Sequence, residues 1–182
     1  MFRILSGTLV LLTILSGFAS ADEKKTKILL VGKDRDHAYA THTYIDDCVL
    51  LAKCLKQTAN VETIVSNGMP KDPKVFAEID AIVLQTRFGG NVLFGGPQRR
   101  HVEAALKRGI GYTAIHWSTG GEGEFGQLQL KTLGGWFHTD FSEYHVRQSI
   151  VRQMAPKHPI SNGWKDFDLR EEYYIKLKYL PE

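Results

Sequence analysis

Residues 27–32 read Lys27-Ile-Leu-Leu-Val-Gly32, a short apolar run that ends in glycine. Such a run is typical of a central strand in a parallel sheet, because both faces of that strand are covered. From Tyr44 to Leu55 the apolar residues recur at spacings of three and four, which predicts a helix with one buried face. A strand followed by a crossover helix predicts an α/β fold with a parallel sheet.

The same alternation continues along the chain. We expect a helix introduced by Pro97 and ended by Gly109, a short helix near residues 128–133, and strands at residues 61–65, 79–84, 111–116, 146–151 and 171–180. Because ligands bind at the carboxyl ends of parallel strands, the loops that follow the strands are the expected place for a functional site.

The N-terminus has the three parts of an export signal: a cation at Arg3, an apolar stretch over residues 9–15, and small residues at 19–21. We expect cleavage after Ala21, which leaves residues 22–182 as one secreted or periplasmic domain. The alternative is a transmembrane anchor, but polar and glycine residues interrupt the run, and it is shorter than the roughly 20 residues that span a bilayer.

The charge pattern indicates which classes of partner to expect. The chain has 23 basic and 20 acidic residues, scattered rather than clustered, so we expect no nucleic-acid partner and, after cleavage, no membrane association. The pattern does not indicate an oligomeric state.

Cys48 and Cys54 lie six residues apart on one predicted helix, roughly 9 Å along its axis, so we expect two buried thiols rather than a disulfide.

Histidines gather in the loops after the predicted strands. His37 and His42 follow the first strand and are candidates for acid–base groups or metal ligands, with solvated loop residues as the alternative. Arg87 follows the third strand and Trp117 the fourth. Both are candidates for binding substrate, together with His37, His42 and Asp140.

His116 ends a predicted buried strand and precedes Trp117, Ser118 and two glycines, which is the form of a strand-to-helix elbow. An elbow normally carries a Ser or Cys nucleophile, so histidine argues against acyl transfer. It leaves an acid–base role, a metal-ligand role or a structural role for His116.

Further candidates lie near the C-terminal third of the chain. His138 follows a Gly-Gly turn, and Asp140 could orient it or join the shell of a divalent metal such as zinc. A loop salt-bridge network is the alternative. Glu171 and Glu172 are adjacent on a strand and point to opposite faces, so only one can serve a given cleft.

Taken together, these segments resemble the ThuA-like, or trehalose-utilisation, domains, which share the class I glutamine amidotransferase-like fold. The resemblance covers residues 27–179 and rests on the loop from Gly32 through His37 and His42, Gly111-Tyr-Thr-Ala-Ile-His116, Leu133-Gly-Gly-Trp-Phe-His138, Lys157-His-Pro-Ile-Ser-Asn-Gly163 and Glu171-Glu-Tyr-Tyr174.

The resemblance implies a flavodoxin-like three-layer sandwich with a mostly parallel sheet. It also implies a pocket lined by His116, His138 and Glu172, with His37 and His42 on its rim. The family's acidic pair is Asp-Glu, whereas this chain has Glu-Glu. Family members continue past this strand to another His-bearing loop, so a chain that stops at Glu182 is expected to be shortened.

Two hypotheses for the function follow. The first is an exported enzyme that acts on a sugar or keto-sugar derivative, with His116 and His138 as acid–base or metal-binding groups and Glu172 as a partner carboxylate. The second is a non-catalytic sugar-binding or interaction module on the same fold. Glutamine hydrolysis is not expected, because His116 stands where amidotransferases have their cysteine.

Overall fold

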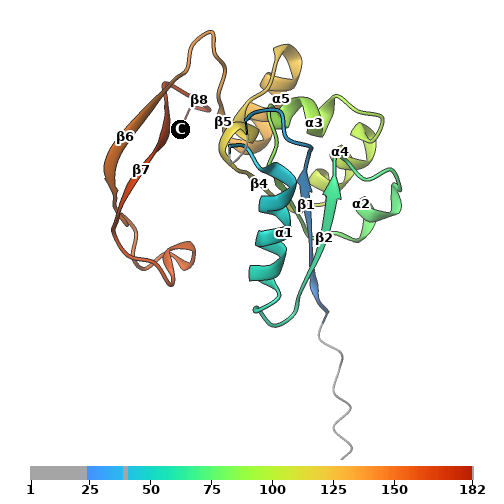
Figure 1. Ribbon diagram of the computed structural model, residues 1–182. Helices are drawn as coiled ribbons and strands as arrows, with labels where there is room; N and C mark the ends of the chain where they lie inside the picture. Colours follow the sequence, from blue (N-terminus) through green and yellow to red (C-terminus); the bar gives the residue numbers. More distant parts are fainter. Residues whose placement is uncertain (1–23, 39–40, 182) are drawn as a thin grey trace, which may run out of the picture.

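The computed structural model describes residues 24–38 and 41–181 (Figure 1). The predicted export signal lies outside this range. Within it, no helix is long and apolar enough to cross a membrane. In chain order the elements are β1 (Thr26–Gly32), α1 (Tyr44–Leu55), β2 (Val61–Asn67), α2 (Lys74–Glu78), β3 (Ala81–Leu84), α3 (Gly89–Phe94), α4 (Arg99–Lys107), β4 (Gly111–Ala114), the 3₁₀ turn η1 (His116–Thr119), α5 (Gly123–Leu133), β5 (Gly135–Trp136), β6 (Glu143–Val151), the 3₁₀ turn η2 (Pro159–Ser161), β7 (Phe167–Ile175) and β8 (Lys178–Tyr179).

Four strands form a parallel sheet in the order β2-β1-β3-β4. The run that begins at Lys27 is its second strand, paired with β2 along its whole length and with β3 from Ile28 to Val31. The order reverses direction between β1 and β3, as in flavodoxin-like folds, and a crevice opens at the carboxyl ends of strands at such a reversal. The predicted α/β fold with a parallel sheet is confirmed.

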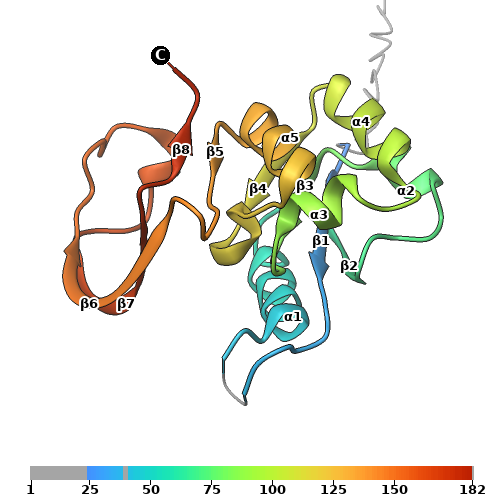
Figure 2. The same cartoon turned by 90° about the horizontal axis from the view of Figure 1, so that it is seen from above.

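Helices cover both faces of this sheet, so the fold has three layers (Figure 2). Alternate side chains of β1 point to opposite faces. Leu30 packs with Cys48 and Ala52 of α1, whereas Leu29 and Val31 belong to the larger core on the other face. Helices α2, α3 and α4 supply the buried partners of that core, and α5 packs against it.

The last long strands differ from the prediction, because β6 and β7 pair with each other in a separate antiparallel ribbon, with Glu143 opposite Ile175. Residues 152–166 between them contain only the turn η2, whereas a parallel pair needs a crossover connection that is usually a helix. The ribbon stands beside the sheet rather than extending it (Figure 1).

Other boundaries follow local chemistry. Helix α1 has the predicted limits, and Gly109, with a φ of 92°, follows the end of α4 as expected. Strand β4 is shorter than predicted because the chain turns at His116, and α5 begins earlier than predicted. The short helices α2 and α3 were not predicted.

The two cysteines differ in burial. Cys48 is buried but Cys54 is exposed, so the expectation of two buried thiols is wrong for Cys54; both thiols are free.

Candidate active site

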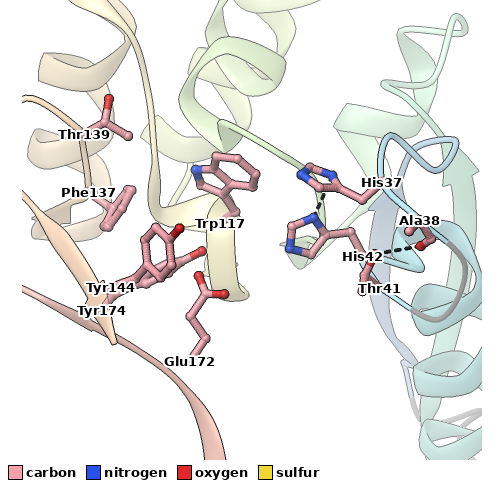
Figure 3. A pocket seen from close by; sticks show the side chains of 10 residues that line it. All are labelled: His37, Ala38, Thr41, His42, Trp117, Phe137, Thr139, Tyr144, Glu172 and Tyr174. Carbon is pink, nitrogen blue, oxygen red and sulfur yellow. Dashed lines mark hydrogen bonds between the residues drawn. The ribbon is translucent and has the colours of Figure 1, made fainter. Parts of the chain in front are cut away.

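A cavity of about 420 Å³ lies where the loops after β1 and β4 meet the β6–β7 ribbon (Figure 3). It occupies the carboxyl ends of the strands, where open parallel sheets bind ligands, and its volume is within the range of small-molecule sites, roughly 300–1,000 Å³. The lining residues are His37, Ala38, Thr41, His42, Trp117, Phe137, Thr139, Tyr144, Glu172 and Tyr174.

His37 and His42, which line this cavity, form a continuous chain of imidazoles with His116, which lies behind the lining. His37 Nδ1 lies 2.5 Å from Asp36 Oδ1 and 2.9 Å from His42 Nδ1. The other nitrogen of His42, Nε2, lies 3.2 Å from His116 Nε2. The chain continues to the Tyr174 hydroxyl, 3.5 Å from His116 Nε2. Each of these five side chains, which come from three parts of the sequence, thus has a polar atom within 3.5 Å of the next one in the chain.

His116 is held by the backbone of the turn that follows β4. Its φ of 52° is in the left-handed region, which costs energy for a residue with a Cβ and is found at sites where the surroundings fix the backbone. Ser118 anchors the turn, because its buried Oγ accepts from Thr86 N at 2.6 Å and donates to Thr86 O at 2.8 Å. Gln129 Nε2 donates to Ser118 O at 2.8 Å.

Aromatic rings form much of the remaining wall. Tyr174 is stacked between Phe137 and His116, with ring centroids 4.3 Å and 5.0 Å away. Trp117 lies 5.7 Å from the His37 ring and 5.5 Å from the His42 ring. The histidines and the ribbon residues therefore face each other with Trp117 between them (Figure 3).

Burial and charge shift several pKa values in the site. Burial, followed by the neighbouring His37 and His116, lowers the pKa of His42. Burial, followed by the Glu172 carboxylate, raises the pKa of Tyr174. Burial would raise the pKa of Asp36, but Lys33, His37 and the nearby Tyr44 hydroxyl outweigh it and bring the pKa to about 2.

Several predicted site residues meet at this cavity. His37, His42, Trp117 and Glu172 line it, whereas the exposed Glu171 does not, in keeping with the opposite orientations of adjacent strand residues. His116 does not line the cavity itself, but it contacts His42 and Tyr174, which do.

The other predicted residues lie outside the lining. The His138 ring packs on Phe141, and its Nδ1 accepts from Asp140 N at 3.2 Å, so this pair forms a local contact of its own. Arg87 is exposed and places its guanidinium 4.8 Å from the centroids of both Phe88 and Trp117. Arg87 therefore supports the outer side of Trp117.

Sequence reasoning missed Tyr174 and Tyr144. Tyr174 is two residues after Glu172 on one strand, and residues at that spacing point to the same face. If Glu172 faces the cavity, Tyr174 is therefore expected to face it too. Tyr144 pairs directly with Tyr174 across the ribbon. That pairing is a long-range contact for which the sequence carries no local signal.

Of the candidate metal ligands from the sequence, His37 and His42 belong to one group of possible ligands in the structure, whereas His116 and His138 do not. Among the described residues, Asp36, His37 and His42 place one ligand atom each within 4.8 Å of one another. All three come from the loop after β1, and His138 is not part of this group.

Comparison with known proteins supports the fold. Neither a protein-family model nor a curated protein matches the chain. A crystal structure from Bacteroides uniformis, provisionally named a ThuA-like protein, aligns with 85% of this chain at a TM-score of 0.57 and 16% sequence identity. The aligned region spans 62% of that protein's length. The chain therefore has the α/β, flavodoxin-like architecture of a protein that bears the ThuA-like name.

Proposed function

We propose that this protein is a ThuA-like domain protein that binds a sugar or keto-sugar derivative in the cavity beside Glu172 and Tyr174, and acts on it by acid–base chemistry. Residues 1–21 would export it, so that its substrates would be carbohydrates outside the cytoplasm. The composition of the cavity wall is the observation that carries the proposal.

The wall combines aromatic faces with hydrogen-bonding groups. Trp117, Phe137 and Tyr144 offer flat apolar surfaces, and Glu172, Thr41 and Thr139 offer polar atoms. A sugar ring has the complementary form, with apolar C–H faces and a rim of hydroxyls, and the electron-rich face of an aromatic ring attracts C–H groups. A few polar groups in a mostly apolar cavity then fix the orientation of the ligand.

The acid–base groups face this ligand from one strand. Glu172 and Tyr174 both line the cavity, and the Tyr174 hydroxyl is next to His116 Nε2. With a keto sugar, the Glu172 carboxylate would take the proton from the carbon next to the carbonyl. The Tyr174 hydroxyl would donate a hydrogen bond to the oxygen that becomes negative, with His116 positioning Tyr174.

The test is a panel of sugars and keto sugars, measured by calorimetric binding and by product formation in NMR spectra. The proposal expects saturable binding and a product from at least one keto sugar. Binding of sugars without any product would support the non-catalytic sugar-binding module. Absence of binding across the panel would overturn both readings.

A further inference from the structure

We infer that Asp36, His37 and His42 form a binding site for one first-row divalent metal ion, of which zinc is the best fit, with an open coordination position toward the cavity. Two histidines and a carboxylate are an established ligand set for zinc in sites that keep a position free for water or substrate. The inference goes beyond the proposed function, which assigns no metal to the cavity. Metal binding can also be measured without any substrate.

The spacing of the ligand atoms fits a metal. Asp36 Oδ1 is 2.5 Å from His37 Nδ1, His37 Nδ1 is 2.9 Å from His42 Nδ1, and His42 Nδ1 is 3.9 Å from Asp36 Oδ1. Ligands bound tetrahedrally at about 2.0–2.1 Å lie about 3.3 Å from one another. The observed separations lie on both sides of this value, so small side-chain rotations suffice.

The hydrogen bonding is also better satisfied with a metal than without one. His37 Nδ1 is close to two ligand atoms but has room for only one hydrogen or one lone pair in the ring plane. With a hydrogen it must divide that hydrogen between Asp36 and His42; without one it faces the Asp36 carboxylate with no donor. A cation between the three atoms accepts a lone pair from each.

Neighbouring side chains hold the ligands in this orientation. Lys33 Nζ lies 2.6 Å from Asp36 Oδ2, which leaves Oδ1 for the metal. His42 Nε2, the nitrogen not used for the metal, contacts His116 Nε2 at 3.2 Å. A contact from the second ring nitrogen fixes the tautomer and the ring orientation of a metal-bound histidine. His116 is therefore a positioning residue for the site.

The open position faces the cavity because both His37 and His42 line it. Glu172 and Tyr174 line the facing wall (Figure 3). A ligand oxygen bound to the metal would thus lie between the ion and the acid–base groups of the ribbon. A divalent ion in that position polarises a carbonyl oxygen as a Lewis acid.

Zinc binding to the chain, purified without a histidine tag and stripped with a chelator, tests the inference. Elemental analysis after reloading should find one zinc per chain, and competition with a chromogenic chelator should give its affinity. Cobalt in place of zinc should give the visible absorption of a four-coordinate ion. His37→Ala and His42→Ala should each weaken zinc binding about tenfold or more, and Asp36→Asn should weaken it as well.

His145→Ala is the matched control, because His145 is a partly exposed histidine on β6 that lies outside the three-residue group. It should bind zinc as the unchanged chain does. Circular dichroism should show that all variants are folded. Absence of stoichiometric zinc, or unchanged affinity in a folded His37→Ala, His42→Ala double variant, would overturn the inference. Stoichiometric zinc together with no sugar binding across the calorimetric panel would leave the metal site intact and count against the proposed function alone.

Discussion

The Nε2 atoms of His42 and His116 lie 3.2 Å apart, although the two residues belong to loops after β1 and β4 that are separated by β3 in the sheet. The contact joins the loop after β1 to the left-handed turn after β4. One imidazole must donate and the other accept, so the pair is oriented as a unit.

This contact predicts energetic coupling between the two histidines. In urea unfolding, the double variant His42→Ala, His116→Asn should be less destabilised than the sum of the single variants, by about 0.5–1.5 kcal/mol, the net value of one hydrogen bond. Asparagine is chosen at position 116 because it tolerates a left-handed backbone. The pair His145→Ala, His116→Asn should be additive; equal coupling in both pairs would contradict the assignment.

Adjacent glutamates on β7 should differ in function. Glu172→Gln removes the carboxylate that lines the cavity and should lower kcat on a keto-sugar substrate by about 10²–10⁴-fold, the usual contribution of a general base. Glu171→Gln changes an exposed side chain on the opposite face and should leave kcat within about twofold. Steady-state kinetics of the two variants tests this prediction. A similar loss of kcat in both variants would exclude Glu172 as the general base.

Gly126 should not accept a side chain. A Cβ at this position would lie 2.2 Å from the Trp136 ring, which is fixed because its Nε1 donates to Gly121 O at 2.8 Å. Gly126→Ala should therefore lower the free energy of unfolding by about 1–3 kcal/mol. Gly96→Ala is the control, since nothing lies within 4 Å of its added Cβ, and it should be neutral. Equal urea midpoints for the two variants would argue against this packing.

The two cysteines should react at very different rates. Burial raises the pKa of the Cys48 thiol to about 11, whereas Cys54 is exposed. Because the thiolate is the reactive form, an aromatic disulfide reagent at pH 8 should label one thiol per folded chain quickly and the second only in urea. Cys54→Ser should abolish the fast phase. Retention of that phase in the variant would show that Cys48 is accessible.

Asp80 should stabilise the fold in a pH-dependent way. Lys27 N donates to its carboxylate at 2.9 Å, and this bond, aided by Lys24, lowers its pKa below the ordinary 3.8. A lowered pKa in the folded state means that the contribution is present above the unfolded-state pKa and is lost as pH falls through the folded-state pKa.

Asp80→Ala should accordingly lower the urea midpoint at pH 7, and the deficit should shrink as the pH falls below about 4. Asp168→Ala is the control, because Asp168 is exposed on the ribbon and no ion pair of it is found among the described residues. A deficit that stays constant with pH would exclude the charge of Asp80 as its cause.

The sequence predicted those parts of the fold that depend on local pattern. The apolar run of β1 and the spacing of Cys48 and Ala52 in α1 reflect burial on known faces, which is why those elements were found with the right type. Because ligands bind at the carboxyl ends of parallel strands, the positions of His37, His42 and Trp117 in the loops after predicted strands indicated that they belong to the site.

The parts of the fold and of the site that were not predicted depend on long-range contacts. The pairing of Tyr144 with Tyr174, and the stacking of Tyr174 on Phe137 and His116, follow from how the ribbon docks beside the sheet. His138 is two residues after Trp136, and its position follows from the packing of its ring on Trp136 and Phe141. Neither arrangement leaves a periodic signal along the chain.

The ribbon that supplies Glu172 and Tyr174 contributes no residue to the two buried apolar clusters that hold the sheet and helices together. Substitutions in the ribbon away from Tyr174, which stacks on the buried Phe137 and on His116, would therefore leave these clusters intact. Substitutions in β6 and β7 offer a route by which related proteins, or an engineer, can change which molecule is recognised while the histidine cluster is inherited unchanged.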